Sequence, residues 1–204
     1  MIAIVDYGLG NIHAFANIYK RLDIPYFFAR TSEDLKLATH IILPGVGAFD
    51  YAMERLNASG MRSTLDHLVL ETKHPVLGVC VGMQILACKS EEGTSNGLGW
   101  IDASVKLFDK SRVQGRTHLP HMGWNNVVPV SNGRLFEDRE FSWRFYFLHS
   151  YYMEPSNSAD ILATSDYGIS FVSAVNHNNI YGVQFHPEKS HSCGTQLLKN
   201  FARL

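Results

Sequence analysis

The residue types that could do chemistry are concentrated in two stretches of this sequence. In the first, an apolar run ends at Cys80, with Gly78 and Gly82 on either side and a helix-like pattern after it. This spacing is typical of a nucleophile elbow, a sharp strand-to-helix turn that presents one side chain at the top of a sheet. The positive end of a helix dipole favours a thiolate, the nucleophilic form of cysteine. The alternative is a structural cysteine, because free cysteines are among the most buried residues in proteins.

The second stretch, residues 182–189, places His186 shortly before Glu188 with a proline between them. A cysteine nucleophile needs a base, and that base needs an orienting group. In extended backbone, residues i and i+2 share a face, so Glu188 can hold one imidazole nitrogen while the other faces Cys80. The alternative for so short a motif is a surface charge pair. His149 is a rival base, or a polar wall of the pocket, and no carboxylate follows closely behind it.

Metal and cofactor sites have less support from the spacing of residues. His186, His191 and Cys193 could be combined into a zinc site, but their spacing matches no standard ligand pattern. Gly8 and Gly10 begin a dinucleotide-binding fingerprint, but the third glycine position holds His13 and no acidic residue ends the next predicted strand. We therefore expect no metal and no cofactor.

The composition indicates an ordinary globular enzyme or binding protein. The 204 residues are 46% hydrophobic and 18% charged, which predicts a single domain spanning residues 1–204. A net charge of −1 gives no reason to expect a nucleic-acid partner. The N-terminus does not resemble a signal peptide, and no apolar run approaches membrane-spanning length. Three cysteines do not indicate a disulfide framework, so we expect a cytoplasmic protein. Cys88 and Cys193 have no base nearby in the sequence and are expected to be packing residues.

The first half of the chain alternates short apolar runs with amphipathic patterns. Strands are expected at 2–6, 25–29, 40–43 and 75–80, and helices at 11–22, from 31, at 51–57, 61–73 and 83–88. This alternation predicts a mainly parallel sheet with helices on both faces. Ligands bind at the carboxyl ends of parallel strands, where Cys80 and the glycine loops at 8–10 and 45–47 would meet.

The second half of the chain predicts strands without long helices between them. They are expected at 104–108, 125–130, 144–148, 161–164, 171–176 and 180–185, with a hairpin turn at 176–179 and a closing helix at 193–204. The aromatic and Met-rich stretch at 119–125 is expected to be a loop that either packs in the core or faces a partner. The fold class is therefore α/β, with a mainly parallel central sheet and an antiparallel C-terminal half.

Several longer strings, taken in order, resemble a known family. They are DYGLGN at 6–11, PGVGAF at 44–49, GVCVGMQ at 78–84, SEEG at 90–93, PHMGWN at 120–125, HSYY at 149–152 and GVQFHPEKS at 182–190. The set resembles the class I (triad-type) glutamine amidotransferases, which have a flavodoxin-like fold. Within them it is most similar to the glutaminase subunits of imidazole glycerol phosphate synthases.

The resemblance implies a catalytic triad of Cys80, His186 and Glu188 that hydrolyses glutamine to glutamate and ammonia. It implies an oxyanion hole formed by the N–H of Val81 and an N–H of the 45–47 loop, here taken as that of Val46. The residues that would hold the glutamine are Gly47, Gln84, Glu92, Ser150 and Tyr151.

The resemblance also implies a partner that uses the ammonia. This partner is a cyclase subunit with a (β/α)8 barrel fold, which makes imidazole glycerol phosphate and an aminoimidazole carboxamide nucleotide in histidine biosynthesis. The residues expected to face it are Asn11, Pro120, Met122, Trp124 and Lys189.

Two departures from the usual sequences keep alternatives open. The stretches at 98–108 and 190–194 resemble paralogues that supply ammonia for sugar amidation in surface-polysaccharide synthesis. A peptidase or chaperone-like relative with the same elbow is disfavoured by Gln84 and the His-Pro-Glu string. The non-enzyme alternative is a catalytically idle subunit that only shapes a partner.

Overall fold

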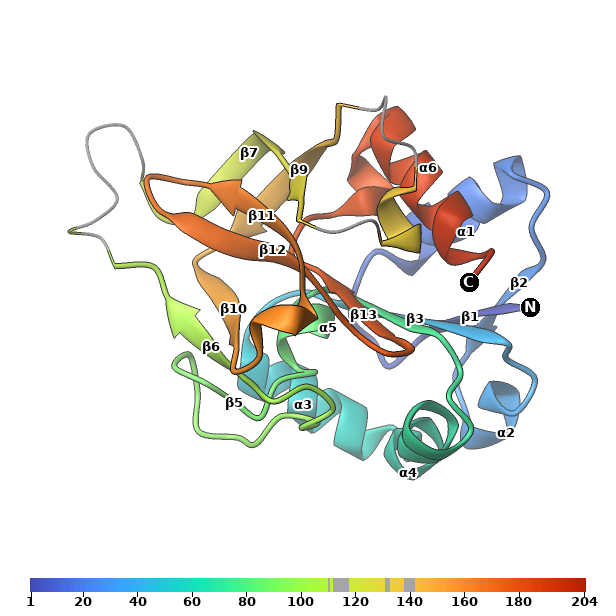
Figure 1. Ribbon diagram of the computed structural model, residues 1–204. Coiled ribbons are helices and arrows are strands. Elements are labelled where there is room, and N and C mark those ends of the chain that lie inside the picture. The colour runs from blue at the N-terminus through green and yellow to red at the C-terminus, as the bar shows by residue number, and fades with distance from the viewer. Residues whose placement is uncertain (110, 112–117, 131–132, 138–141) are drawn as a thin grey trace.

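A computed structural model of the protein describes residues 1–109, 111, 118–130, 133–137 and 142–204 (Figure 1). Its main sheet has the strand order β2-β1-β3-β4-β13-β12-β10-β6-β5, and the strands from β2 to β13 run parallel to one another. These parallel strands are β1 (Ile2–Val5), β2 (Tyr26–Ala29), β3 (His40–Gly45), β4 (Val76–Cys80) and β13 (Ile180–Val183). All residues of β1 and β4 are buried, as expected for central parallel strands covered on both faces.

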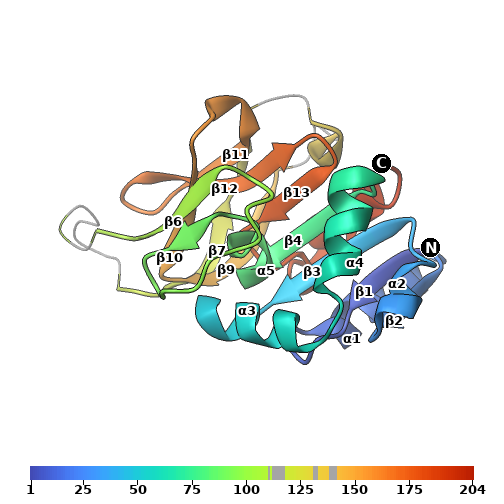
Figure 2. The same cartoon turned by 90° about the horizontal axis from the view of Figure 1, so that it is seen from below.

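Helices cover both faces of this parallel part (Figures 1 and 2). One face carries α1 (Ile12–Arg21) and α6 (His191–Phe201), which contact each other. The opposite face carries α2 (Ser32–Leu35), α3 (Phe49–Ala58) and α4 (Arg62–Asp66), the last continuing as a π-helix over His67–Glu71. Apolar residues at helical spacing, such as Phe15, Ile18 and Tyr19 of α1, are buried against the sheet.

The C-terminal half extends the sheet with antiparallel strands. β13 pairs with β12 (Ser170–His177), which also pairs with β11 (Ile161–Asp166) and β10 (Tyr151–Pro155). Beyond β10 lie β6 (Ala103–Leu107) and β5 (Lys89–Ser90), and β8 (Val128–Pro129) pairs with β11. A separate two-stranded sheet is formed by β7 (His121–Asn126) and β9 (Arg144–His149). The predicted fold class is therefore confirmed.

Three predicted elements are wrong in detail. The helix expected at 83–88 is the single turn α5 (Val81–Gln84), so Cys88 lies outside it and is exposed instead of packed. The stretch expected to be a loop at 119–125 mostly forms β7, because it pairs with β9. The strand expected at 125–130 is divided between the end of β7 and β8, and the strands β5 and β10 were not expected. No helix among the described residues is long and apolar enough to cross a membrane.

Candidate active site

The turn from β4 to α5 has the geometry of a nucleophile elbow. Cys80 adopts φ 57° and ψ −114°, a conformation that is costly for a residue with a Cβ. A Cβ on Gly82 would overlap the carbonyl oxygen of Leu43, and one on Gly78 would lie 2.5 Å from the carbonyl oxygen of Gly82. Glycine is therefore required at both flanking positions, and the spacing predicted this strand-to-helix turn correctly.

His186 and Glu188 lie beside Cys80 at the end of β13. His186 Nδ1 is 2.9 Å from Glu188 Oε1, and only 4% and 2% of the two side chains are exposed. The sequence predicts that extended backbone places the two side chains on one face. In the structure, a 3₁₀ turn over Pro187–Lys189 brings the carboxylate back to the ring instead. The Ser190 hydroxyl donates to the His186 carbonyl at 2.6 Å and stabilises this turn.

The electrostatics of the pair suit a base. Burial alone would lower the pKa of His186, but hydrogen bonds to Cys80 and Glu188, and the negative charges of these groups, outweigh burial and raise it. Since Nδ1 is bound to Glu188, the other ring nitrogen is the one that faces the sulfur. The three residues therefore form the chain of contacts that an activated cysteine needs.

One pocket contains most of the predicted site residues. It is lined by Val46, Gly47, Cys80, Val81, Gln84, Glu92, Leu148, His149, Ser150, Tyr151, His186 and Lys189. The structure thus brings together all of the residues predicted for catalysis, for the oxyanion hole and for substrate, with Glu188 directly behind His186. The first N–H groups of a helix have no partner within it, so the N–H of Val81 is available to an oxyanion.

Glu92 connects the pocket to the glycine loop that follows β3. Its Oε2 accepts from the backbone N–H of Phe49, the first residue of α3, at 2.8 Å. The neighbouring Asp50 accepts from the N–H groups of Thr94 and Ser95 at 2.9 and 3.0 Å, and these bonds hold the pKa of Asp50 below its usual range. Sequence reasoning missed Asp50, although it directly follows the string PGVGAF at 44–49.

Gln84 is oriented by two hydrogen bonds to groups that are far away in the sequence. Its Nε2 donates to the Tyr151 carbonyl and to Gln184 Oε1, both at 3.1 Å. With both amide hydrogens in use, the amide oxygen is the group left to face the pocket. Gln184 was not predicted as a site residue.

His149 is a wall of the pocket and not a base. Its Nδ1 donates to the Tyr151 carbonyl at 2.7 Å, so its Nε2 accepts from His121 Nδ1 at 3.0 Å. His121 in turn lies 3.3 Å from Asn125 Nδ2, and its ring stacks on Tyr167 with centroids 4.0 Å apart. Burial lowers the pKa of His149 to about 3 and that of His121 to about 4, which keeps both rings neutral.

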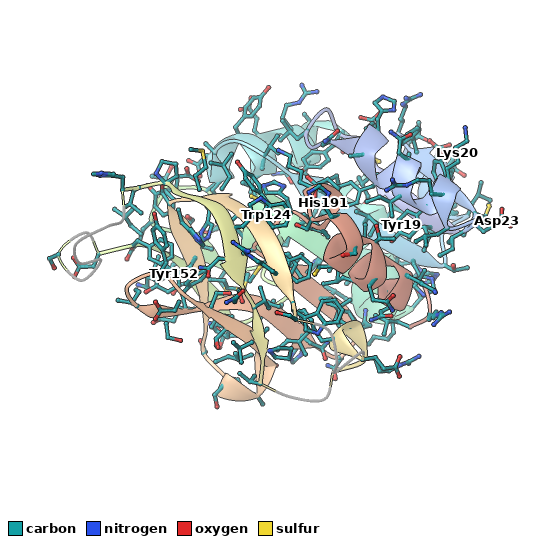
Figure 3. All side chains as sticks on the ribbon, turned by 90° about the horizontal axis from the view of Figure 1, so that it is seen from above. Tyr19, Lys20, Asp23, Trp124, Tyr152 and His191 are labelled. Atoms are coloured by element: carbon teal, nitrogen blue, oxygen red, sulfur yellow. The ribbon has the colours of Figure 1, made fainter. Side chains whose placement is uncertain are left out.

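The residues predicted to face a partner lie outside the pocket, with one exception. Asn11, Pro120, Met122 and Trp124 are exposed, Met122 by 66% and Trp124 by 40%. Figure 3 shows Trp124 next to His191, on which it stacks with ring centroids 5.1 Å apart. The exception is Lys189, which lines the pocket and lies over the ring of Tyr146.

The residues considered for a zinc site have separate partners. His186 is bound to Glu188, His191 stacks on Trp124, and Cys193 Sγ contacts the Ser142 carbonyl at 3.5 Å. Within the part of the chain that the structure describes, no group of three His, Cys, Asp or Glu side chains could hold a metal ion.

Known proteins with similar sequences share one name. The chain is 57% identical to "Imidazole glycerol phosphate synthase subunit HisH" of Bdellovibrio bacteriovorus and 52% identical to that of Leptospira interrogans, each over 204 residues and the whole of both chains. It is 45% identical, over the same length, to "Imidazole glycerol phosphate synthase subunit HisH 2" of Pseudomonas aeruginosa.

Solved structures agree in fold. A structure described as a glutamine amidotransferase matches with a TM-score of 0.74 at 18% identity, over 100% of this chain and 99% of that one. A structure from Thermoplasma acidophilum, described as a putative GMP synthase subunit, matches with a TM-score of 0.72 at 21% identity, over 99% and 92%. The family model for glutamine amidotransferase class-I matches residues 3–204. The chain therefore belongs to the class-I glutamine amidotransferase family.

Proposed function

We propose that this chain is the glutaminase subunit of an imidazole glycerol phosphate synthase in histidine biosynthesis. It hydrolyses the side-chain amide of glutamine to glutamate and ammonia, and a cyclase subunit uses the ammonia. The observation that carries the proposal is the contact of Cys80, at an elbow, with the buried His186–Glu188 pair in one pocket. The names of the relatives that match the full length support the choice of pathway.

The mechanism follows from the positions of these groups. His186 accepts the proton of Cys80, and the thiolate attacks the amide carbon of glutamine. The N–H of Val81 and that of Val46 stabilise the oxyanion, and His186 then donates its proton to the departing ammonia. The resulting thioester is hydrolysed by a water molecule that gives its proton to His186, through a second oxyanion. Glutamate leaves, and the thiol is restored.

The pocket wall provides groups for the rest of the substrate. The free amide oxygen of Gln84 and the second carboxylate oxygen of Glu92 are acceptors for the α-ammonium group of glutamine. Gly47, Ser150 and Tyr151 line the same pocket and complete the substrate site.

The partner is a cyclase subunit with a (β/α)8 barrel, in a heterodimer located in the cytoplasm. Its binding surface includes Asn11, Pro120, Met122, Trp124 and Lys189. Exposed Met and Trp side chains on one strand suit such a surface, because both residue types are enriched at protein interfaces. The glutaminase itself is one domain over residues 1–204.

The direct test is the Cys80→Ala variant, assayed for glutamate release with and without the cyclase. We expect hydrolysis to be lost while the far-UV circular dichroism spectrum stays unchanged. Full activity in this variant would refute the assignment.

Two further outcomes separate the alternatives. If a glutamine-analogue electrophile forms no adduct with Cys80 even in the presence of the partner, the chain is an idle binding subunit. If the partner that co-purifies aminates a sugar instead of the histidine-pathway nucleotide, the glutaminase assignment stands and the pathway does not.

A further inference from the structure

Gln184 is a buried amide at the centre of the site that the mechanism above does not use. It follows β13 directly, its side chain is fully buried, and its backbone N–H donates to the Ser173 carbonyl at 2.9 Å. Burying a primary amide is costly unless its donors and acceptors find partners. The partners of the Gln184 side chain are therefore informative about its role.

The side chain of Gln184 bridges the nucleophile and a pocket residue. Its Nε2 lies 3.9 Å from Cys80 Sγ, within range of a hydrogen bond to sulfur, and its Oε1 accepts from Gln84 Nε2 at 3.1 Å. Gln84 Nε2 donates in addition to the Tyr151 carbonyl. A continuous polar chain thus runs from the sulfur to the wall of the pocket.

The direction of every bond in this chain is fixed. The Tyr151 carbonyl can only accept, so Gln84 must present its amide nitrogen on that side. Since the same nitrogen faces Gln184, Gln184 must present its oxygen to Gln84. Its NH₂ group is then left for Cys80, and the amide cannot flip without losing both contacts.

This direction matters when the thiol loses its proton. Cys80 Sγ is also 3.9 Å from the Leu148 carbonyl, to which a thiol can donate but a thiolate cannot. Once His186 takes the proton, the sulfur becomes an acceptor, and Gln184 Nε2 is a donor already aimed at it. Hydrogen bonds to a charged acceptor are about twice as strong as neutral ones. The contact with Gln184 therefore strengthens as the nucleophile forms.

We propose that Gln184 is a positioning residue for the reaction: its amide donates to the Cys80 thiolate and holds the Gln84 amide oxygen toward the glutamine. This inference rests on the proposed function, in which Cys80 is the nucleophile and Gln84 contacts the substrate. The amide nitrogen of Gln184 acts on Cys80, and its amide oxygen acts on Gln84.

The test is Gln184→Met, which keeps the length of the side chain and removes both polar ends. The first measurement is the rate of Cys80 alkylation by iodoacetamide at pH 7, with Cys88 and Cys193 replaced by serine in all variants. We expect a fall of about tenfold, since a hydrogen bond to a charged group is lost. In glutamine hydrolysis with the cyclase, we expect kcat to fall more than KM rises, whereas Gln84→Met should mainly raise KM.

The matched control is Asn200→Leu in α6. Asn200 is also a buried amide whose nitrogen donates to a carbonyl, that of Leu135, and whose oxygen accepts from an amide, that of Gln196. This variant should lose stability without changing the alkylation rate or kcat. If Gln184→Met does not fold, Gln184→Asn is the substitute, because it keeps the amide but shortens its reach. The same fall in the alkylation rate is expected.

The proposal is overturned if the Gln184 variant is alkylated at the wild-type rate. It is also overturned if the alkylation rate of the Asn200 variant falls as much as that of the Gln184 variant. Alkylation needs neither glutamine nor the cyclase. If the wild-type protein does not hydrolyse glutamine but the alkylation rates still differ, the proposed function fails, while the hydrogen bond from Gln184 to the Cys80 thiolate is supported.

Discussion

Two parts of the fold hold their functional residues by different means. In the parallel part of the sheet, Cys80 is positioned by backbone packed on backbone: Gly78 and Gly82 leave no room for a Cβ, and Cys80 itself has a positive φ. In the second half of the chain, side chains position other side chains, as in the His186–Glu188 pair after β13 and the chain from Asn125 through His121 to His149 on β7 and β9. Backbone packing leaves a glycine pattern in the sequence, whereas side-chain contacts between distant residues leave almost none.

The largest effect should come from the side-chain contact between His186 and Glu188. Glu188→Gln keeps the shape of the side chain but removes the charge that orients the His186 ring. We expect kcat for glutamine hydrolysis to fall by about 10⁴-fold, the scale at which a triad responds when its acid becomes an amide. Glu154→Gln, an exposed change on β10, is the control and should leave kcat unchanged. A loss below tenfold at Glu188 would show that His186 is oriented by other contacts.

The next effect tests backbone packing in the parallel half. Gly82→Ala forces a Cβ onto the Leu43 carbonyl, which cannot move without disturbing β3. We expect the free energy of unfolding to fall by about 3 kcal/mol or more, measured by urea denaturation. Gly60→Ala is the control: Gly60 has a positive φ but open space around it, so its cost should be about 1 kcal/mol. Equal costs would mean that overlap at the elbow is unimportant.

Backbone strain at Cys80 should have a smaller effect, and there glycine should be more stable than alanine, the reverse of the usual order. Cys80→Gly and Cys80→Ala both remove the sulfur, but only the alanine retains a Cβ at φ 57°. The glycine variant should therefore be more stable by about 1 kcal/mol, after allowing for the greater entropy of its unfolded chain. In Ala163→Gly on β11, glycine should be the less stable residue, as is usual in strands. The same order at both sites would contradict strain at the elbow.

The smallest effect concerns the neutral histidines of β7 and β9. Burial lowers the pKa of His121 to about 4, so the unfolded chain binds a proton near pH 6.5 that the folded chain does not. Stability from this site is complete above pH 6.5 and declines as the pH falls toward 4. In His121→Gln, the free energy of unfolding should decline less steeply over this interval, by about 1 kcal/mol per pH unit. Urea denaturation at pH 6.5, 5.5 and 4.5 measures the slope, and identical slopes would argue against a neutral His121.

The sequence predicted the elbow and the contact between His186 and Glu188 because their signals are local. Cys80 has its glycines beside it, and Glu188 follows His186 within one turn. Gln184 lies 100 residues from Gln84, and His121 lies 28 residues from His149, so no spacing indicated either contact. Their contacts exist only once the strands are assembled.

The wrong elements have a related cause. The helix expected to reach residue 88 ends at Gln84 because the carbonyls of Ile85 and Leu86 accept from Leu98 and Ile101, which come from a distant segment. The aromatic and Met-rich stretch at 119–125 is expected to be a loop, but pairing with β9 makes most of it a strand. In both cases tertiary hydrogen bonds overrode a local preference.

The elbow glycines also bear on how such an enzyme could be redesigned. A Cβ on Gly78 or Gly82 would meet backbone atoms, and β3 and β4 are in register from Ile41 and Val76 to Gly45 and Cys80. The place of the sulfur is thus set by backbone packing in the sheet. A library that randomises Ser150, which lines the same pocket, can therefore search for new carboxamide substrates while the nucleophile stays where it is. Natural or laboratory selection can therefore change the substrate preference of the pocket without altering the backbone that positions Cys80.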